Sequence, residues 1–414
     1  MSSKELIIVV TGANGGVGYG ICQRLMIQLS QLDPADARPV FPEVSTKLSQ
    51  SEYAAFRSSA AAGVTIIMAC RDLNRAEVAK TKLYVVLDDH IKKLPEGSSS
   101  REYATRYRAN FRLAIHRYPH ISHLICNAGT ATYSHLDIWA FTMDLLRAPV
   151  AAIEHPNSNI QRNGVLSSDN LGYTWQCNVF GHYVLFRTLQ PLLSKYCYAV
   201  DKASLGAPAR VLWMSSLESR PMYDPANDWQ LIKTNHSYQA SKYQMELICA
   251  ELSKNTEHSQ IQKILHFIVS PGITSTNMST LLNIRIPFYR TLMLIVFYVI
   301  RLLGSPNILF SVYKAAIAAV HIALVPLVYI PASANDLPPQ VYTPTHSSSE
   351  RAPFALRFCS QNDRCGREYV GIMPVPVWEE YPHEGKPLLE RFERLYQTFV
   401  EAERGSVDPD AGAS

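Results

Sequence analysis

The chain has 414 residues, of which 47% are hydrophobic and 18% are charged, and its formal net charge is +4. This apolar content excludes a mainly disordered protein, because disordered chains lack the side chains that form a core. The small net charge comes without any long basic run, which argues against a dedicated nucleic-acid-binding protein.

The eight cysteines lie mostly inside apolar segments and predict reduced core thiols, because disulfide frameworks belong to short secreted chains. Cys359 and Cys365 have no second cysteine pair to complete a zinc site, so we expect no metal. No signal-peptide pattern precedes the apolar run that begins at Leu6, and we therefore expect the catalytic part to face the cytosol.

The first predicted strand, over residues 6–10, leads into the glycine-rich turn TGANGGVG and then into a helical pattern. This order is typical of a dinucleotide-binding site, although an ordinary strand-helix turn is the alternative. Gly16 would let the backbone approach a pyrophosphate, Gly18 would let the helix pack closely on the strand, and the helix N-terminus would offer amide donors. The predicted cofactor contacts in this turn are Thr11, Gly12, Asn14, Gly16 and Gly18.

Residues 30–63 are rich in Ser, Ala and Pro and are predicted to form an insertion. A second buried strand, VTIIMAC, covers residues 64–70 and is followed directly by Arg71. In NAD-binding sheets an acidic residue at this point binds the ribose 2′-hydroxyl, whereas an arginine accommodates the 2′-phosphate of NADP. Arg71 therefore favours NADP(H) as the cofactor, and a solvated surface arginine is the alternative.

A doubly wound sheet needs another strand between residues 74 and 121, where no clear strand pattern is found. Two interpretations are open. Residues 83–87 (LYVVL) could form the strand, or residues 74–95 could form one long helix and the strand could be missing from this chain. We favour the missing strand, which would remove one wall of an adenine pocket and one edge of the sheet.

The later strands alternate with helices, which predicts an α/β fold with a doubly wound parallel sheet, a Rossmann fold. The predicted strands cover residues 123–126, 210–216 and 264–270. The predicted helices cover residues 173–193 and 237–252. We expect a single domain over residues 1–280, enlarged by the insertion already described and by two more at 130–170 and 217–236.

Tyr238 and Lys242 are four residues apart on a predicted helix, so both side chains lie on one face. A nearby cation favours a phenolate and lowers the tyrosine pKa, giving a usable general acid-base. The preceding strand ends in Ser215-Ser216, and Asn178 could join the group through a water molecule. A surface helix pair is the alternative interpretation of the tyrosine and the lysine.

Residues 286–303 form the most hydrophobic stretch, but their uncharged centre is only the ten residues between Arg290 and Arg301. A spanning helix needs about 20 apolar residues. We therefore predict a helix lying in a membrane interface, with a buried core helix as the alternative. Residues 281–330 are accordingly predicted to be a membrane-associating and substrate-entry segment. Residues 331–414 are predicted to be a Pro- and Ser-rich extension that closes with an amphipathic helix.

The motifs occur in the order found in the short-chain dehydrogenase/reductase family, which the chain resembles over residues 5–280. They are TGANGGVG, Asn127-Ala128-Gly129, Asn178, Ser216, Tyr238-xxx-Lys242 and Pro271-Gly272. Three further segments are similar to the fungal 3-keto-steroid reductases of ergosterol synthesis, up to about residue 330. They are QCNVFGHYVL (176–185), LIKTNHSYQASK (231–242) and VIRLLGSP (299–306).

The resemblance implies an NADPH-dependent reductase that converts the C3 ketone of a C4-demethylated sterol into a 3β-hydroxyl group. Tyr238 would protonate the sterol oxygen, and Lys242 would bind the nicotinamide ribose and lower the tyrosine pKa. Ser216, favoured over Ser215 by its second position, would hydrogen-bond the carbonyl group. Asn178 would hold a proton-relay water.

The resemblance also implies that Asn127 lines the adenosine side and that Thr276 closes over the cofactor. It implies a place on the cytosolic face of the endoplasmic reticulum membrane or of lipid droplets. The implied partners are the sterol C4-demethylation enzymes and oxidosqualene cyclase. Two alternatives are open: a reductase of another lipid ketone or of retinal, which the ACRD segment (69–72) also resembles, or a scaffold subunit of a sterol-synthesis complex.

Overall fold

The computed structural model describes residues 5–41, 63–114, 118–197, 208–257, 264–274, 289–331, 356–375 and 383–406, and everything below refers to these. Eight strands form the main sheet, in the order β12-β11-β8-β7-β4-β1-β2-β3. Their bounds are β1 (Leu6–Thr11), β2 (Val64–Ala69), β3 (Phe111–Ala114), β4 (His123–Cys126), β7 (Ala209–Met214), β8 (Ile264–Ser270), β11 (Leu356–Asn362) and β12 (Glu368–Pro374). All neighbouring pairs are parallel except β11 and β12.

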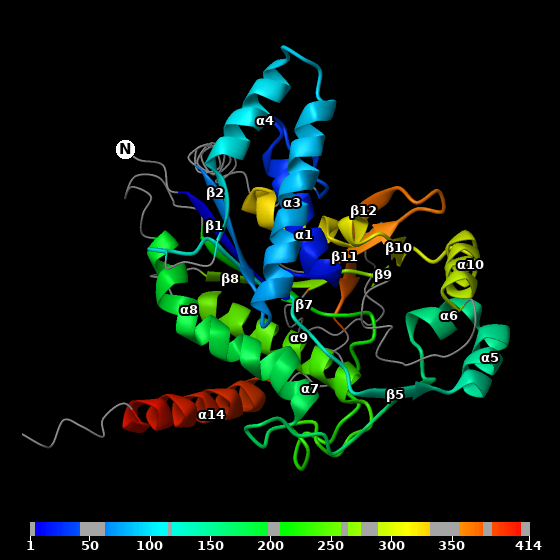
Figure 1. Cartoon of the computed structure of the whole chain (residues 1–414). Coiled ribbons are helices and arrows are strands. Elements are labelled where there is room, and N and C mark those ends of the chain that lie inside the picture. The colour runs from blue at the N-terminus through cyan, green and yellow to red at the C-terminus, as the bar shows by residue number, and fades with distance from the viewer. Residues whose placement is uncertain are drawn as a thin grey trace, which may run out of the picture.

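Helices lie on both faces of this sheet, as the predicted doubly wound α/β fold requires (Figure 1). The helical segments are α1 (Gly16–Leu29), η1 (Ala35–Ala37), α3 (Leu73–Lys93), α4 (Ser99–Asn110), α5 (Ile138–Arg147), α6 (Pro149–Glu154), α7 (Tyr173–Trp175), η2 (Gln176–Phe180), α8 (Gly181–Cys197), α9 (Ser237–Glu257), α10 (Tyr289–Leu302), α11 (Val312–Ala315), α12 (Ile317–Leu324), η4 (Leu327–Tyr329) and α14 (Gly385–Ser406). Two small two-stranded sheets pair β5 (Tyr133–Leu136) with β6 (Asn159–Gln161) and β9 (Ile273–Thr274) with β10 (Ile308–Phe310).

The side chains of β7 show which helices cover the two faces of the sheet. Arg210 donates to the carbonyl oxygens of Ile322 and Val325, at the end of α12. Trp213 instead packs against Phe186 of α8. Because successive side chains of a strand point to opposite faces, α12 and α8 cover opposite sides of the sheet. Strands covered on both faces need continuous apolar runs, and all six residues of β1 are buried.

The predicted absence of a third strand is wrong. Residues 73–93 do form one long helix, α3, but the strand follows later, as β3 beside β2. It is a four-residue edge strand that begins with Phe111, and Arg112 on it is exposed, so it lacks the apolar run that marks the central strands. Tyr84 of α3 accepts a hydrogen bond from the amide of Leu113 at 3.1 Å and holds the strand in place.

The last part of the described chain completes the sheet on its other side. Strand β11 pairs in parallel with β8, and β12 folds back on β11. Helix α14 then packs on α9, with Phe392 fully buried among the rings of Trp175, Phe180 and Trp229. The predicted division of the chain at residues 280 and 330 into functional segments stays a prediction.

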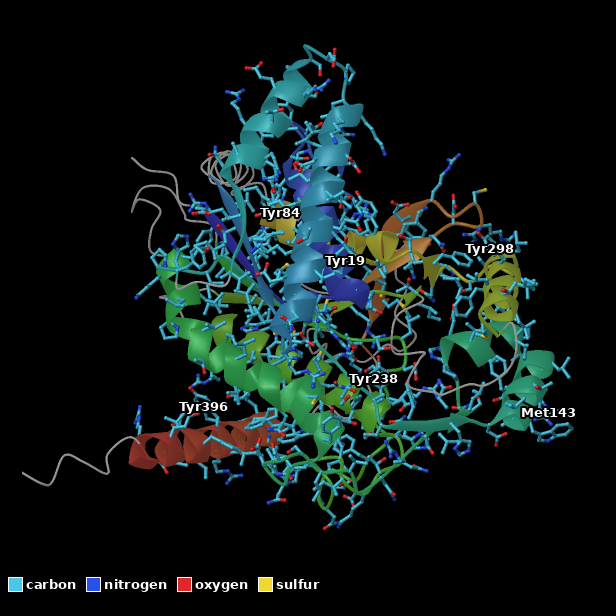
Figure 2. All side chains as sticks on the ribbon, viewed as in Figure 1. Tyr19, Tyr84, Met143, Tyr238, Tyr298 and Tyr396 are labelled. Carbon is cyan, nitrogen blue, oxygen red and sulfur yellow. The ribbon has the colours of Figure 1, made fainter. Side chains whose placement is uncertain are left out.

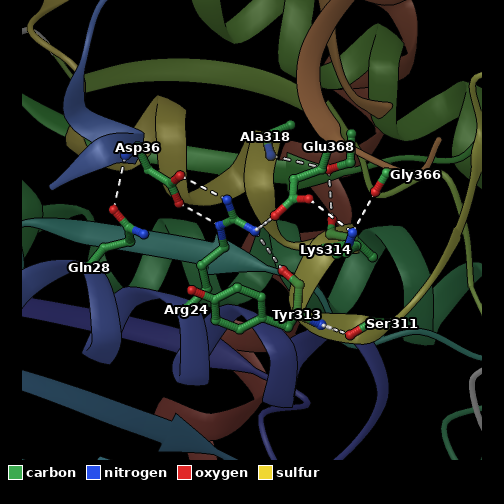
Figure 3. A network of polar contacts seen from close by, with 11 residues as sticks. Arg24, Gln28, Asp36, Ser311, Tyr313, Lys314, Ala318, Gly366 and Glu368 are labelled. Atoms are coloured by element: carbon green, nitrogen blue, oxygen red, sulfur yellow. Dashed lines mark hydrogen bonds and ion pairs between the residues drawn. The ribbon is translucent and has the colours of Figure 1, made fainter. Parts of the chain in front are cut away.

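A buried polar network joins the two ends of the chain (Figure 3). Arg24 of α1 forms a two-point ion pair with Asp36 at 2.5 and 2.9 Å and reaches Glu368 of β12 at 3.3 Å. Lys314 of α11 also pairs with Glu368. Asp36 belongs to the beginning of the predicted insertion 30–63, whose residues 42–62 lie outside the described part. The start of this segment is therefore anchored in the interior.

The hydrophobic segment predicted at 286–303 contains α10, which is not a buried core helix, because most of its described side chains are half-buried or exposed. Its inner face joins α5, α6, β9 and β10 in a small hydrophobic cluster separate from the main core. In Figure 1, α5, α6 and α10 lie together at one side of the molecule. Among the helices of the described residues, none is both long and apolar enough to cross a membrane.

Candidate active site

The glycine turn after β1 depends on backbone conformations and close contacts that glycine allows and other residues do not. Gly12 and Gly16 have φ angles of +66° and +51°, in the left-handed region that glycine adopts without strain. A Cβ atom on Gly18 would lie 2.4 Å from the carbonyl oxygen of Gly12. Helix α1 begins at Gly16 after Gly15, which has no side chain to cap it. The first amide groups of α1 therefore donate no hydrogen bond to a capping side chain.

Thr11 and Asn127 lock this turn to the end of β4. The Thr11 hydroxyl accepts hydrogen bonds from the amides of Asn127 and Ala128 at 2.8 and 2.9 Å. The Asn127 side chain donates to the Thr11 carbonyl at 2.9 Å, and His182 approaches the Thr11 hydroxyl at 3.0 Å. In this arrangement both side chains hold the backbone of the turn. Asn14 is half-buried on the same turn.

Arg71 is exposed and follows β2 close to the glycine turn, because the carbonyl of Ala69 accepts a hydrogen bond from Gly12. The neighbouring Asp72 caps α3, accepting a hydrogen bond from the amide of Arg75 at 3.0 Å. The Asp72 carboxylate therefore serves as the N-cap of α3, and Arg71 is the charged side chain that lies beside the glycine turn. Thr276, predicted to close over the cofactor, lies outside the described residues.

Tyr238 and Lys242 stand on α9 at the carboxyl end of β7, and Figure 2 shows Tyr238 near the centre of the molecule. The Lys242 ammonium group donates to the carbonyl of Met214 at 2.8 Å and lies 5.8 Å from the centre of the Tyr238 ring. Ser216 hydrogen-bonds to the Tyr238 hydroxyl, which favours the phenolate. These three side chains are brought together as the spacing predicted.

The pKa values of this pair differ from those that the sequence predicts. Burial raises the pKa of Tyr238 above its usual value, and the nearby Glu218 charge raises it further. Burial also lowers the pKa of Lys242 to about 8, against the opposing effect of Glu246. The physical reason is desolvation: both charged forms lose water because the two residues are buried, and the ammonium group lies over the ring instead of on the hydroxyl.

The two adjacent serines have separate partners. Ser215 donates to Glu246 at 2.5 Å, within a buried group that also holds Ser219 and Arg357. The Arg357–Glu246 ion pair is 2.7 Å long and almost fully buried, so it fixes the carboxylate of α9 to which the Ser215 hydroxyl donates. Ser216 is thereby the hydroxyl that faces Tyr238, which agrees with the choice made from the resemblance.

Asn178 lies on a π-helical turn, η2, a local feature found often at functional sites. Its side-chain amide donates to the carbonyl of Thr130 and to the hydroxyl of Ser241, both at 2.9 Å, and its oxygen accepts from the Thr130 amide at 2.8 Å. The side chain thus connects the loop after β4 to α9. Its implied role in holding a water molecule stays a prediction.

Two residues that the sequence did not single out also line this corner. Glu218 receives a hydrogen bond from the Gln239 side chain at 3.2 Å and interacts electrostatically with Tyr133 and Tyr238. Gln161 of β6 accepts from the Tyr238 amide at 2.9 Å. An acidic residue two positions after Ser216 was a signal that could have been used. Gln161 had none, because it lies on a three-residue strand within the predicted insertion 130–170.

No family model matches the chain. It is 33% identical over 260 residues to the 3-keto-steroid reductase of Debaryomyces hansenii, covering 63% of each chain. It is 36% identical over 271 residues to that of Eremothecium gossypii, covering 64% of this chain and 67% of the relative. With the Schizosaccharomyces pombe 3-keto-steroid reductase, 27% identity extends over 393 residues, 94% of this chain and 96% of the relative.

Solved structures with a similar arrangement include the Pseudomonas aeruginosa RhlG/NADP active-site complex, with a TM-score of 0.41 and 16% identity, covering 78% of this chain and 90% of that one. Another is the 3-ketoacyl-(acyl-carrier-protein) reductase of Brucella melitensis complexed with NADH, with a TM-score of 0.41 and 14% identity over 80% of this chain and 95% of that one.

The parallel sheet, the glycine turn and the tyrosine-lysine pair define a nucleotide-dependent oxidoreductase fold of the short-chain type. Together with the sequence relatives, they show that the chain belongs to the 3-keto-steroid reductase group of the short-chain dehydrogenase/reductase family. The chain spans 63% and 55% of the lengths of the Debaryomyces hansenii and Kluyveromyces lactis relatives that it matches.

Proposed function

We propose that this protein is an NADPH-dependent reductase of a 3-keto sterol, which converts the C3 ketone of a C4-demethylated intermediate into a 3β-hydroxyl group. The observation that carries the proposal is the meeting of Ser216, Tyr238 and Lys242 at the carboxyl end of β7, within a chain of this family. The carboxyl ends of parallel strands are where ligands bind in such sheets.

The glycine turn supports the cofactor part of the proposal. The missing Cβ of Gly18 lets α1 pack closely against the Gly12 carbonyl, and the first turn of α1 offers amide donors and a positive dipole end to a pyrophosphate. Arg71 would pair with a 2′-phosphate, since Asp72 is occupied as a helix cap. When bound, a nicotinamide dinucleotide would supply the hydride. Thr276 and Asn127 stay predicted cofactor contacts.

The remaining chemistry falls to side chains of this protein. The phenol of Tyr238 would give its proton to the ketone oxygen as that oxygen gains charge, and Ser216 would donate a hydrogen bond to the same oxygen. The Lys242 ammonium group would stabilise the phenolate that remains. Ala131 and Tyr133 pack beside Tyr238 and form an apolar wall suited to a sterol ring.

We further propose that α10 lies in a membrane interface on the cytosolic side, where a sterol would be found. Its outward side chains are apolar, as an interfacial helix requires. The place at the endoplasmic reticulum or lipid droplets, and the association with the C4-demethylation enzymes and oxidosqualene cyclase, stay predictions from the resemblance.

The test is NADPH oxidation by the full chain with a 3-keto sterol in liposomes. We expect Tyr238→Phe to lower the rate by about 100-fold or more, since it removes the general acid. The matched control Tyr396→Phe, on α14, should keep the wild-type rate. Comparable rates for wild type and Tyr238→Phe would refute the mechanism. Faster reduction of retinal or of another lipid ketone than of the 3-keto sterol would show that the substrate is a different one. Faster oxidation of NADH than of NADPH would show that Arg71 does not bind a 2′-phosphate.

A further inference from the structure

Helices α5 and α10 come from distant parts of the sequence but share one small core. The inward side chains Phe141 and Leu145 of α5 and Val296 and Phe297 of α10 belong to the same cluster. Trp139 and Leu146 are seven residues apart on the other face of α5, and both are 76% exposed. In Figure 2, Met143 of α5 and Tyr298 of α10 lie on the same side of the molecule.

The outward face of α10 has the same character as that of α5. Ile295, Tyr298 and Leu302 recur at helical spacing and are each more than half exposed. Trp139, Leu146 and Ile138 are the corresponding exposed apolar side chains of α5, and we call the two sets together the α5/α10 surface. Monomeric soluble proteins rarely expose large contiguous apolar patches unless these bind a partner or a membrane.

The charge of this region decides between those two occupants. The sequence has no Asp or Glu between residues 258 and 335, whereas it has Arg285, Arg290 and Arg301 there. Arg301 lies 5.0 Å from the ring of Tyr298 and 4.8 Å from that of Phe310. On α10, exposed apolar and aromatic side chains with arginines and without acids match the interface of an anionic bilayer, and α5 carries one acid, Asp144, together with Arg147.

We propose that α5 and α10 insert side by side into one anionic lipid interface, with Trp139 as the anchor contributed by α5. This rests on the proposed membrane contact of α10 and extends it to α5, a helix in the predicted insertion 130–170. Strand β5 leads from Tyr133, whose ring lies 6.3 Å from that of Tyr238, to α5. Its four residues span about 13 Å, so the membrane surface would lie a short distance from the candidate acid.

The test is co-sedimentation of the full chain with phosphatidylcholine vesicles, with and without phosphatidylserine. We expect phosphatidylserine to strengthen binding, and Trp139→Gln with Leu146→Gln to weaken it about tenfold or more, because two apolar contacts are lost. Ile295→Gln with Leu302→Gln should weaken it similarly. The matched control Val78→Gln, an exposed valine on α3, should bind as wild type does.

Unchanged binding of the α5 variant, with weakened binding of the α10 variant, would overturn the role of α5 and leave the proposed function of α10 intact. Unchanged binding of both variants would refute the membrane proposal itself. A lipid-independent dimer in sedimentation equilibrium that Trp139→Gln dissociates would assign the surface to a second copy and overturn the inference. Circular dichroism checks that each variant is folded.

A second inference concerns Glu218, on independent evidence. Its amide donates to the Ser216 hydroxyl at 3.2 Å, and its carboxylate is held by the Gln239 amide. The charged and titratable groups that face it are Tyr133 of β5, Tyr238 of α9 and Arg220 of its own loop. Because Gln239 directly follows Tyr238 on α9, this hydrogen bond holds an acidic side chain next to the residue that carries the proposed proton.

We infer that Glu218 is a positioning residue that controls how readily Tyr238 releases its proton. In the reduction, the O–H bond of Tyr238 breaks and a new O–H bond forms on the ketone oxygen, so negative charge remains on the phenol oxygen. An ionised Glu218 opposes that charge, whereas a neutral Glu218 does not. Burial raises the pKa of Glu218 to about 7, so both forms occur near neutral pH.

The test compares the kcat of ketone reduction by wild type and Glu218→Gln between pH 6 and 9. We expect the rate ratio of variant to wild type to rise several-fold as the pH increases through about 7, because only the wild type gains the opposing charge. Glu218→Asp should restore the wild-type profile, and Glu77→Gln, on the exposed face of α3, should not change it. A ratio that is constant with pH would overturn the inference, since a merely structural role lowers the rate equally at every pH.

Discussion

Helices α14 and α10 are both amphipathic, yet their apolar faces are covered in opposite ways. On α14, Leu388 and Phe392 are buried against the protein, and charged residues such as Glu401 and Glu403 face outward. On α10, Ile300 is buried in the small cluster, whereas Ile295 and Leu302 are exposed. Two amphipathic helices of one chain can therefore have different surroundings. The protein itself covers the apolar face of α14, whereas the exposed apolar side chains of α10 mark a helix whose outer face is not covered by the described residues.

The largest expected effect lies on the α14 side. Phe392→Ala should lower the free energy of unfolding by about 3–5 kcal/mol, because it leaves a cavity among four aromatic rings. Urea denaturation measures this. A loss below about 1 kcal/mol would show that α14 contributes little, and that the contrast with α10 is smaller than the packing indicates.

An intermediate effect comes from acid, which acts mainly on the sheet, since α5, α6 and α10 contain no histidine and the half-buried His155 follows α6 as its C-cap. Burial lowers the folded-state pKa of His123 and His266 to about 3, below the unfolded value near 6.5. The folded protein therefore binds fewer protons below pH 6.5, and its stability falls as the pH decreases. At pH 5 each histidine should cost about 2 kcal/mol relative to pH 7.

Denaturant titrations at pH 7 and pH 5 check this expectation. His266→Gln should show a weaker pH dependence than wild type, while it keeps a side-chain acceptor for the indole of Trp213, which now donates to His266 at 3.2 Å. An equal pH dependence in both proteins would mean that other groups control acid unfolding.

The smallest expected effect lies on α10. Ile295→Gln should change the free energy of unfolding by less than about 0.5 kcal/mol, because the side chain is already exposed in the folded protein. The same substitution at Phe297, in the small cluster, serves as the contrasting variant and should destabilise clearly. Urea denaturation without lipid measures both. A large loss from Ile295→Gln would mean that the outer face of α10 is covered within the protein.

The strands and helices near the glycine turn could be predicted because local signals agree there. The apolar run of β1, the turn after it and the pattern of α1 point to the same unit, and Tyr238 and Lys242 are close because four residues make about one helical turn. Strand β3 could not be predicted in this way. An edge strand of four residues is stabilised by pairing with β2, which the sequence around Phe111 does not encode locally.

The candidate site shows the same limit. Ser216, Tyr238 and Lys242 carry recognisable spacing, whereas Glu218 reaches Tyr238 from a loop and Gln161 from a strand of the predicted insertion. The assignment of Ser216 over Ser215 also depends on a distant partner, since Glu246 and Arg357 hold the first serine. Interactions between residues far apart in sequence have no period from which they could be predicted.

The sequence by itself determined the class of the fold, the order of the cofactor and candidate catalytic motifs, and the position of one unusually apolar helix. These properties depend on side chains within a few residues of each other. Only the tertiary structure decided that a third strand exists, that residues 356–374 complete the sheet, and that α5 and α10 share one small hydrophobic cluster. Those features depend on burial and hydrogen bonding between distant segments, which are set only when the chain has folded.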